Sequence, residues 1–303
     1  MRLFLCFFFT GFYVLAQNVD FEGSVIDFKT NDAIPYVNIS FLNTLKGTST
    51  TEEGKFHLEI PKDYLQKKIH VSSLGYKDTI LMAQSLYKTK QLKMVAASFE
   101  LEEVVVAKKL GASQILNPIS SYSITSGFDS SSTPWVLALY FPNIGASKKY
   151  LKTITVFFRQ KNEFTREKAK FRLRFYNVDS KSKMPNKDMV QKSIILESVR
   201  TYDYTSIDIS SLKLQMPQNG VYIGLEWLFI PYNWYQKGEK NPITNKPIIE
   251  DRFAPTFGGM YTKNQNFKAM IYGMGEWQEF KVKSKDNNQN FIPAISLKIA
   301  KGK

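Results

Sequence analysis

The chain of 303 residues contains a single cysteine and only two histidines. One cysteine, Cys6, cannot form a disulfide bond within the chain, and it cannot complete the cysteine-rich ligand set of a structural zinc site. Neither His57 nor His70 stands in an HExxH or HxxE pattern, which argues against a zinc peptidase. Glycine and proline are also scarce, with 16 and 12 residues, so collagen-like and linker-dominated chains are excluded.

Motifs of the common catalytic classes are missing as well. No GxSxG, P-loop or GxGxxG occurs in a usable context, and a serine triad would have to recruit a histidine from the first third of the chain. The aspartates Asp129, Asp179 and Asp188 are scattered without a fixed ligand spacing, so a structural calcium ion stays an open option that no motif supports. We therefore expect no enzymatic activity and, beyond that ion, no cofactor.

Long apolar runs are absent except at the start of the chain. After a positively charged beginning, the uncharged segment Leu3–Ala16 ends in small residues at cleavage-compatible spacing, which predicts a secretory signal peptide at residues 1–16. The run is shorter than the ~20 residues that span a bilayer, and an uncleaved anchor is the alternative. Cleavage would leave a cysteine-free chain without a transmembrane segment, exported to the periplasm, the outer membrane or the cell surface.

What the sequence does have is an excess of positive charge in its later part. Residues 17–107 carry 10 basic and 12 acidic side chains, whereas residues 108–303 carry 30 basic and 15 acidic ones. Between the two, residues 108–133 are rich in Ser, Thr and Gly, as linkers are. The length and this asymmetry predict two domains, at 17–107 and 134–303, with a linker or irregular connecting segment at 108–133.

The N-terminal domain has the pattern of short strands broken by turn residues. In YVNISFLN (36–43) apolar and polar side chains alternate with period two, which is typical of a half-buried strand. Residues 47–60 predict a hairpin with its turn around Gly54. Six or seven such strands without a helical period predict a small antiparallel β-sandwich.

An ordered set of short segments in this domain resembles a known family. The segments are Gly23–Val25, Ile34–Ile39, Gly47–Thr50, Glu53–Phe56 and Ser73–Tyr76. Over about residues 20–98 they resemble the carboxypeptidase-regulatory-like domain, which is a transthyretin-like β-sandwich. The resemblance implies a seven-stranded sandwich that serves as a scaffold and carries no catalytic residues.

The segment that follows, Leu101–Val106, resembles the stretch after this domain in TonB-dependent outer-membrane receptors of Gram-negative bacteria. About 195 residues remain after it, too few for a plug and a 22-stranded barrel. The resemblance therefore implies an envelope location, while the receptor function does not carry over. A scaffold role in an outer-membrane complex, with a partner protein docked on the edges of the sandwich, is one alternative function.

The C-terminal half also predicts strands, eight or more of them. They lie at 135–141, 151–160, 170–179, 193–199, 205–210, 220–230, 267–273 and 294–300. Such a series predicts a jelly-roll-like β-sandwich of two sheets. It resembles C-terminal β-sandwich domains of uncharacterised bacterial envelope proteins and, in outline, carbohydrate-binding jelly rolls, although architecture alone confers no ligand.

Glu226 is a carboxylate within the otherwise apolar strand 222–227. A glycan hydrolase needs little more than two facing acids, so Glu226 with Asp208, Asp203 or Glu197 is the catalytic candidate of a second alternative function. The interpretation that we prefer is an ion pair between Glu226 and an arginine on a neighbouring strand.

One feature that favours binding is a basic strand. In KAKFRLRFY, Lys168, Lys170, Arg172 and Arg174 alternate with apolar residues, so that one face of the strand carries four cations. Residues 148–192 hold 14 basic and 4 acidic side chains. Such a surface would attract acidic polysaccharide, lipid headgroups or another envelope polyanion, while export disfavours nucleic acid; a solvated face without a ligand is the alternative.

The second feature is a predicted loop after 220–230, in which aromatic residues precede a polar stretch to Asp251. Aromatic side chains on a loop can stack on sugar rings, or they can anchor a long loop. We predict a non-enzymatic binding or adhesion protein of the bacterial envelope, with a glycan or anionic polymer as its ligand. The binding residues that we expect are Tyr232, Trp234, Tyr235, Lys170, Arg172 and Arg174.

Overall fold

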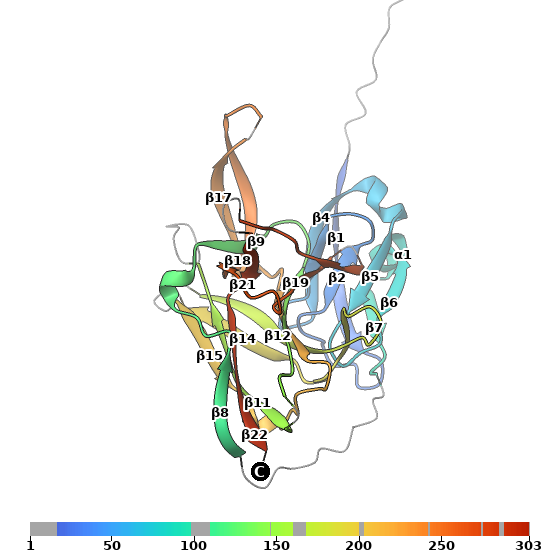
Figure 1. Cartoon of the computed structure of the whole chain (residues 1–303). Helices are drawn as coiled ribbons and strands as arrows, with labels where there is room; N and C mark the ends of the chain where they lie inside the picture. The colour runs from blue at the N-terminus through green and yellow to red at the C-terminus, as the bar shows by residue number, and fades with distance from the viewer. Residues whose placement is uncertain are drawn as a thin grey trace, which may run out of the picture.

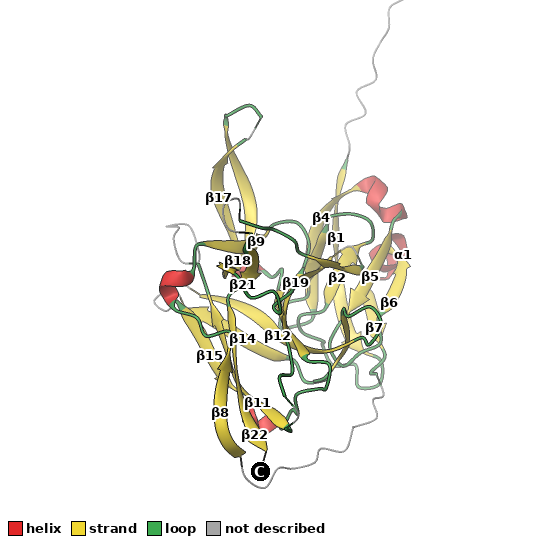
Figure 2. Cartoon of the chain, in the orientation of Figure 1, coloured by secondary structure: helices red, strands yellow, loops and turns green. Residues whose placement is uncertain are grey.

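The computed structural model describes residues 17–97, 110–145, 147–159, 168–199, 203–241, 243–273, 275–284 and 288–302. The predicted signal peptide and the receptor-like segment Leu101–Val106 lie outside these residues. The described chain forms two β-rich units, which lie side by side (Figure 1). Strands dominate both units (Figure 2), and the described residues contain one α-helix. The all-β fold class predicted from period-two patterns is confirmed.

The N-terminal unit, residues 17–97, is a sandwich of seven strands. Its elements are β1 (Asn18–Asp27), β2 (Asn38–Phe41), β3 (Gly47–Ser49), β4 (Lys55–Pro61), η1 (Lys62–Gln66), β5 (Lys68–Ser72), β6 (Thr79–Met82), α1 (Ala83–Thr89) and β7 (Gln91–Met94). One sheet has the order β4-β1-β7 and the other the order β3-β2-β5-β6. Phe21 of β1 packs edge-on against Phe41 of β2, and these rings join the two sheets through the core.

The C-terminal unit, residues 110–302, begins inside the segment that we expected to be a linker. Its strands are β8 (Leu110–Leu116), β9 (Ser126–Ser130), β10 (Val136–Phe141), β11 (Lys149–Phe157), β12 (Lys168–Val178), β13 (Pro185–Asp188), β14 (Ile194–Val199), β15 (Tyr204–Asp208), β16 (Val221–Trp227), β17 (Trp234–Lys240), β18 (Pro247–Thr262), β19 (Ala269–Gly273), β20 (Glu276–Glu279), β21 (Asn290–Pro293) and β22 (Ile295–Gly302). Short 3-10 turns are η2 (Ser121–Ser123), η3 (Ser210–Leu212) and η4 (Pro231–Asn233).

These strands form three sheets around one large core. The largest has the order β13-β12-β16-β10-β19-β20, with β14 also paired to β12. It faces a second sheet, β15-β11-β22-β8, and a third, β17-β18-β21, in which β9 pairs with β18. Phe171, Trp227 and Phe257 meet in the centre of this core, with ring centroids 4.6–5.2 Å apart. As predicted, alternate residues of β12 point into the core.

Several segments differ from the sequence-based expectations. Residues 47–60, expected to form a hairpin, supply β3 and β4 to different sheets. Residues 108–133 contain β8, which pairs with the last strand β22, and β9, which pairs with β18; their small polar residues are tolerated because both strands lie at sheet edges. The stretch from Trp234 to Asp251, expected to be a loop, is a β-hairpin. Helix α1 was not predicted, because seven residues are too few to show a helical period.

Among the described residues no helix has the length and hydrophobicity to cross a membrane. The two cores are separate clusters, one in each unit. A smaller apolar cluster joins the units: Tyr36 of the N-terminal unit packs with Leu228 and Ile230 of the C-terminal unit. The two units are therefore held together by a buried apolar contact. We call the region where they meet the junction, and it positions the candidate site.

Candidate functional site

The floor of the junction is a buried ion pair between neighbouring strands. Arg172 of β12 lies directly opposite Glu226 of β16, and its Nη1 donates to Glu226 Oε1 at 3.0 Å. Both side chains are almost completely buried, with 1% and 0% of their surface exposed. The preferred prediction for Glu226, an arginine partner on a neighbouring strand, is confirmed. Charges buried this deeply require partners for every polar atom.

The N-terminal unit supplies some of those partners. Arg172 Nη2 donates to the backbone oxygen of Tyr36 at 2.7 Å, and Asn38 Nδ2 donates to Glu226 Oε1. Asn38 is held in turn by Ser49, whose hydroxyl donates to its Oδ1 at 2.8 Å and accepts from the backbone N–H of Phe229 at 3.0 Å. Three of these hydrogen bonds therefore cross between the units: from Arg172 to Tyr36, from Asn38 to Glu226 and from Phe229 to Ser49.

A second arginine completes the cluster. Arg174 Nη1 donates to Glu226 Oε2 at 3.3 Å, while its other donors bind Asp188, with Nε 3.0 Å from Oδ1. Burial raises the pKa of Asp188 above its ordinary value, and the neighbouring Arg174 opposes that rise. Both oxygens of Glu226 are thus engaged by cationic or amide donors, and its carboxylate has no path to a substrate.

At the edge of the junction, Lys170 forms an ion pair with Glu52 of the N-terminal unit, and Glu52 also accepts from the hydroxyl of Tyr36. These hydrogen bonds, with that of Lys170 the stronger cause, hold the pKa of Glu52 below its ordinary value. Burial and the bond to Glu52 raise the pKa of Tyr36 to about 12. Tyr36 adopts a left-handed backbone conformation with φ of 57°, which is costly for a residue with a side chain.

The expected basic surface of β12 is therefore corrected. The alternation is real, but the face opposite the core is covered by the N-terminal unit, so Arg172 is buried and Arg174 is mostly buried. Lys170 is bound to Glu52, and only Lys168 remains exposed. A period-two pattern identifies residues on one face, but it cannot tell whether water or protein covers that face.

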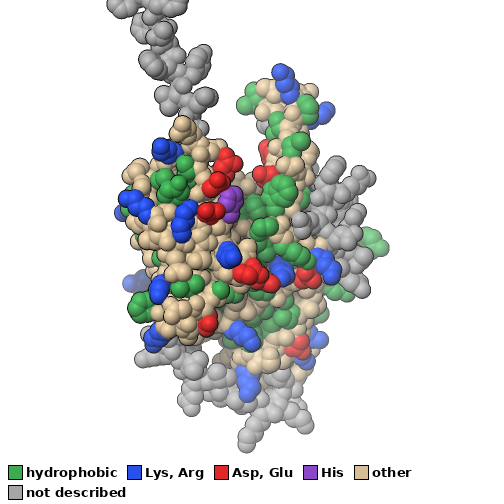
Figure 3. Space-filling view, turned by 180° about the vertical axis from the view of Figure 1, so that it is seen from behind, with side chains coloured by type: hydrophobic (Ala, Val, Ile, Leu, Met, Phe, Trp, Pro, Cys, Tyr) green, Lys and Arg blue, Asp and Glu red, His purple; other side chains and the backbone are tan. Residues whose placement is uncertain are grey.

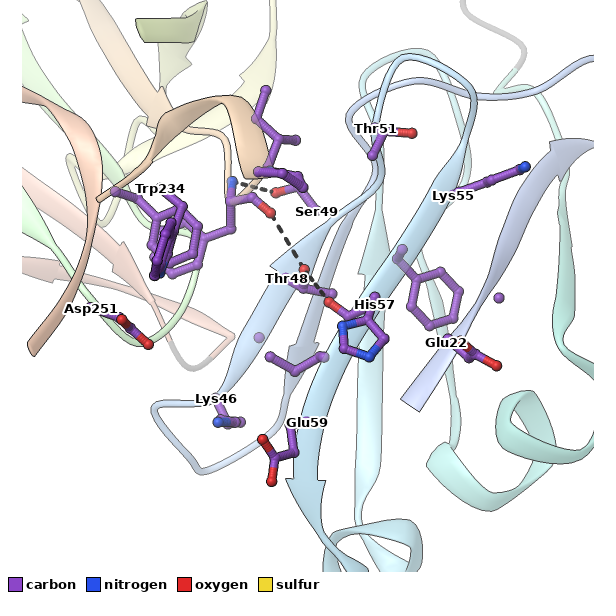
Figure 4. Close-up of a pocket in the computed structure, with 18 of the residues that line it drawn as sticks. Glu22, Lys46, Thr48, Ser49, Thr51, Lys55, His57, Glu59, Trp234 and Asp251 are labelled. Carbon is purple, nitrogen blue, oxygen red and sulfur yellow. Dashed lines mark hydrogen bonds between the residues drawn. The ribbon is translucent and has the colours of Figure 1, made fainter. Parts of the chain in front are cut away.

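Beside this closed floor the junction opens into a cleft of about 1230 Å³. Figure 3 shows the hollow, with hydrophobic side chains on the side of the β17–β18 hairpin and acidic and histidine side chains across from them. Trp234 and Asp251 lie on one side, and Lys46, His57 and Glu59 lie on the other (Figure 4). The cleft thus has one aromatic wall from the C-terminal unit and one polar wall from the N-terminal unit.

The position of Trp234 is fixed by three hydrogen bonds of the buried side chain of Asn233, which we call the clamp. The side chain of the preceding residue, Asn233, accepts from the backbone N–H of Lys170 at 2.8 Å and donates to the carbonyl oxygens of Lys170 and Leu228 at 2.7 and 2.8 Å. Trp234 then pairs with Phe253 across the hairpin, and Phe253 stacks on Phe229 with ring centroids 3.9 Å apart. Trp234 itself is 39% exposed.

The other two predicted aromatic residues do not line the cleft. Tyr232 donates its hydroxyl to Glu197 Oε1 at 2.7 Å, and its ring receives the Lys170 ammonium 5.3 Å from its centroid. Tyr235 is buried between Ala169 and Ala254. Both contacts correspond to the anchoring role that we had set against sugar stacking. Of the three residues, Trp234 alone is placed beside an open space.

The polar wall comes from β1, β3 and β4, with Lys46 before β3 and Lys90 before β7. The sequence patterns grouped residues 47–60 but did not join them to β1. Thr48 Oγ1 lies 3.4 Å from the carbonyl oxygens of both His57 and Phe229, so it bridges the two units at the back of the cleft. His57 Nε2 lies 3.0 Å from Asp20 Oδ1, and Lys90 lies 3.4 Å from Glu22. The wall presents hydroxyl, carboxylate, ammonium and imidazole groups, which together both donate and accept hydrogen bonds.

Comparison with protein families decides the nature of the N-terminal unit. Residues 21–106 match the family model of the CarboxypepD_reg-like domain. The N-terminal unit is a CarboxypepD_reg-like domain. This confirms the resemblance drawn from the short segments between Gly23 and Tyr76. Those segments also have a role that sequence reasoning missed, since Tyr36, Asn38 and Ser49 of the CarboxypepD_reg-like domain make the contacts across the junction.

Solved structures offer a weaker likeness. The chain is similar to a variant of the clostridial cysteine protease Cwp84 after propeptide cleavage, at 13% identity and a TM-score of 0.39, over 62% of this chain and 40% of that one. It is also similar to the cysteine protease and lectin-like domains of Cwp84, a surface layer associated protein of Clostridium difficile, at 10% identity and a TM-score of 0.39, over 88% and 59%. The chain spans less than two thirds of either structure. A search of curated proteins finds no match.

For catalysis or metal binding the described residues offer little. In the described part of the chain no group of three or more His, Cys, Asp or Glu side chains is placed to hold a metal ion. Glu226 is sealed beneath the CarboxypepD_reg-like domain, and Glu197, one of its proposed companions, binds Tyr232. What the arrangement can do chemically is hold a ligand between the aromatic wall and the polar wall of the cleft.

Proposed function

We propose that this chain is an exported, non-enzymatic binding protein of a bacterial envelope, and that its ligand is a glycan held in the cleft against Trp234. The observation that carries this proposal is the partly exposed indole of Trp234, which faces a polar wall across a space of about 1230 Å³. An aromatic face packs on the apolar C–H surface of a sugar ring, and mixed donors and acceptors suit its hydroxyl groups.

The charges of the cleft favour a glycan over a purely anionic polymer. Glu22, Glu59 and Asp251 line it together with three lysines, so no single sign prevails. The cations of β12 that we expected to bind a polyanion are engaged elsewhere, Arg172 and Arg174 by Glu226 and Lys170 by Glu52. The ligand set that we propose therefore keeps Trp234 and leaves these three cations out.

The test is binding of the protein to a panel of bacterial envelope glycans, with Trp234→Ala and Tyr122→Ala compared. Tyr122 is fully exposed and lies outside the cleft, so it controls for the loss of an aromatic side chain. We expect Trp234→Ala to weaken binding about tenfold or more at an unchanged melting temperature, because it removes the stacking surface. Equal binding by Trp234→Ala and wild type would contradict the proposal.

A further inference from the structure

The β17–β18 hairpin extends away from the body of the C-terminal unit (Figure 1). Its paired strands run from Trp234 opposite Phe253 to Lys240 opposite Pro247. Near the middle of β17, a Cβ built on Gly238 would meet no atom within 4 Å, so this part of the hairpin stands free in solvent. Among the described residues, neither core cluster includes a residue of its outer half.

The tip is folded by its own polar contacts. Asn241 Oδ1 accepts from the backbone N–H groups of Ile243 and Thr244, each at 2.9 Å. The backbone N–H of Asn241 donates to the Lys246 carbonyl at 2.9 Å, and that of Asn245 donates to the Asn241 carbonyl at 2.8 Å. The turn therefore needs no apolar side chain for its stability, because an Asx-type contact already fixes it.

Two apolar side chains of the hairpin are nevertheless open to solvent. Ile243, in the turn, is 92% exposed and Ile249, opposite Gly238 below the turn, is 72% exposed; they are the two most exposed large aliphatic side chains in the described part of the chain. Their exposure is unfavourable in water and serves no packing function in the described fold. Ile243, at the end of a protruding hairpin, is placed to enter another apolar phase.

The charged side chains of the hairpin differ between the turn and the strands below it. Below the turn they are paired, Lys237 with Glu239 at 2.5 Å and Arg252 with Glu250 at 2.5 Å. From Lys240 to Pro247 the sequence holds two lysines and no acid. Neither Lys240 nor Lys246 forms an ion pair with a described residue, and both are exposed. Two ammonium groups thus flank Ile243 in the turn, whereas Ile249 lies below them, opposite Gly238 and next to Glu250.

We infer that the turn of the β17–β18 hairpin inserts into an anionic lipid bilayer, with Ile243 entering the acyl region and Lys240 and Lys246 binding headgroup phosphates. An apolar side chain with flanking lysines matches the two layers of a lipid surface, an apolar interior beneath a negative face. A protein partner would present a fixed pocket for Ile243, and nothing in the described part of the hairpin specifies the shape of one.

This inference does not depend on the proposed glycan function, since no tip residue lines the cleft.

The experiment measures sedimentation of residues 17–303, which include every described residue, with vesicles of phosphatidylcholine alone or with phosphatidylglycerol. The test variant is Ile243→Asp, and the matched control is Ile80→Asp, since Ile80 is 59% exposed elsewhere. We expect wild type and control to bind the anionic vesicles, more weakly as salt rises, and the tip variant to bind about tenfold less or worse.

A second measurement reports insertion directly. With Thr244→Cys labelled by an environment-sensitive dye, anionic vesicles should shift the emission to the blue, whereas the same dye at Ser85→Cys on α1 should not respond. Failure of wild type to bind anionic vesicles would overturn the inference. So would equal binding by the tip variant and the control, or a dye at position 244 that stays in water.

Discussion

The two parts of the interface between the units are opposites. Around Arg172 every charge is buried and paired, and the CarboxypepD_reg-like domain and its neighbour share one hydrogen-bond network. Around Trp234, which directly follows Asn233 in the sequence, the same two units stand apart and leave an open cleft. The difference shows a division of labour: the closed part fixes the geometry, and the open part is free to receive a ligand.

In the closed part, we expect the largest loss of stability when Arg172 is replaced. In Arg172→Ala, Glu226 stays buried with one arginine fewer and the Tyr36 carbonyl loses its donor, so we expect a loss of about 3–5 kcal/mol in the free energy of unfolding. Urea unfolding followed by tryptophan fluorescence measures it. The double variant Arg172→Met/Glu226→Leu should recover part of that loss, because it removes both charges; a single variant as stable as wild type would contradict the shared network.

Asn233 links the closed part to the open one. Asn233→Ala leaves two backbone carbonyls and one N–H without their partner inside the protein, and we expect a loss of about 2–3 kcal/mol in unfolding free energy. Glycan binding should fall as well, because the clamp positions Trp234. Asn266→Ala, at an exposed asparagine, is the control and should change neither quantity. Full glycan affinity in the destabilised Asn233 variant would show that the hydrogen bonds of Asn233 are not needed to position Trp234 in the cleft.

Gly47 lies where the two units are in close contact. A Cβ at this position would lie 2.8 Å from the Ile39 carbonyl, 2.8 Å from Thr133 Oγ1 and 2.9 Å from Pro134 Cδ. Gly47→Ala should therefore push the units apart and cost about 1–2 kcal/mol of stability. Gly238→Ala, where a Cβ meets open space, should leave the melting temperature unchanged. Equal melting temperatures for both variants would show that the two units can move apart at Gly47 without a loss of stability.

The smallest effect is expected at the rim, where Glu52 meets Lys170 and Tyr36. The pKa of Glu52 is lowered in the folded state, so its contribution is present above the ordinary value of 4.5 and is lost as the pH falls through the lower folded-state pKa. Glu52→Gln should therefore unfold at a slightly lower urea concentration than wild type at pH 7, and this difference should shrink as the pH falls below 4.5. A difference that persists unchanged at pH 3 would have another origin.

Period-two patterns predicted much of the fold but little of the site. In β12 they placed Phe171 and Leu173 correctly in the core, because alternation is a property of the strand itself. They placed Arg172 in solvent, because no local pattern records that a second unit covers the opposite face. The pairing of Glu226 with an arginine was predictable, since a charge among apolar neighbours needs a partner nearby.

The cleft shows the same limit. Trp234 was recognisable as an aromatic residue beyond a strand, but Tyr232 and Tyr235 differ from it only in the tertiary contacts that bury or bind them. The polar wall opposite comes from strands far earlier in the chain, and its hydroxyl and charged residues look like ordinary surface positions. Only the docking of the two units brings the walls together.

The contact between Tyr36 and Arg172 has a consequence for how such proteins diversify. A CarboxypepD_reg-like domain transferred to another partner would keep the strained backbone of Tyr36 without the guanidinium that it serves. The C-terminal unit, on its own, would be left with Leu228 and Ile230 in water. Separating the two units thus destabilises each of them. We therefore expect related proteins to keep both units together, with correlated substitutions at positions 36, 38, 172 and 226.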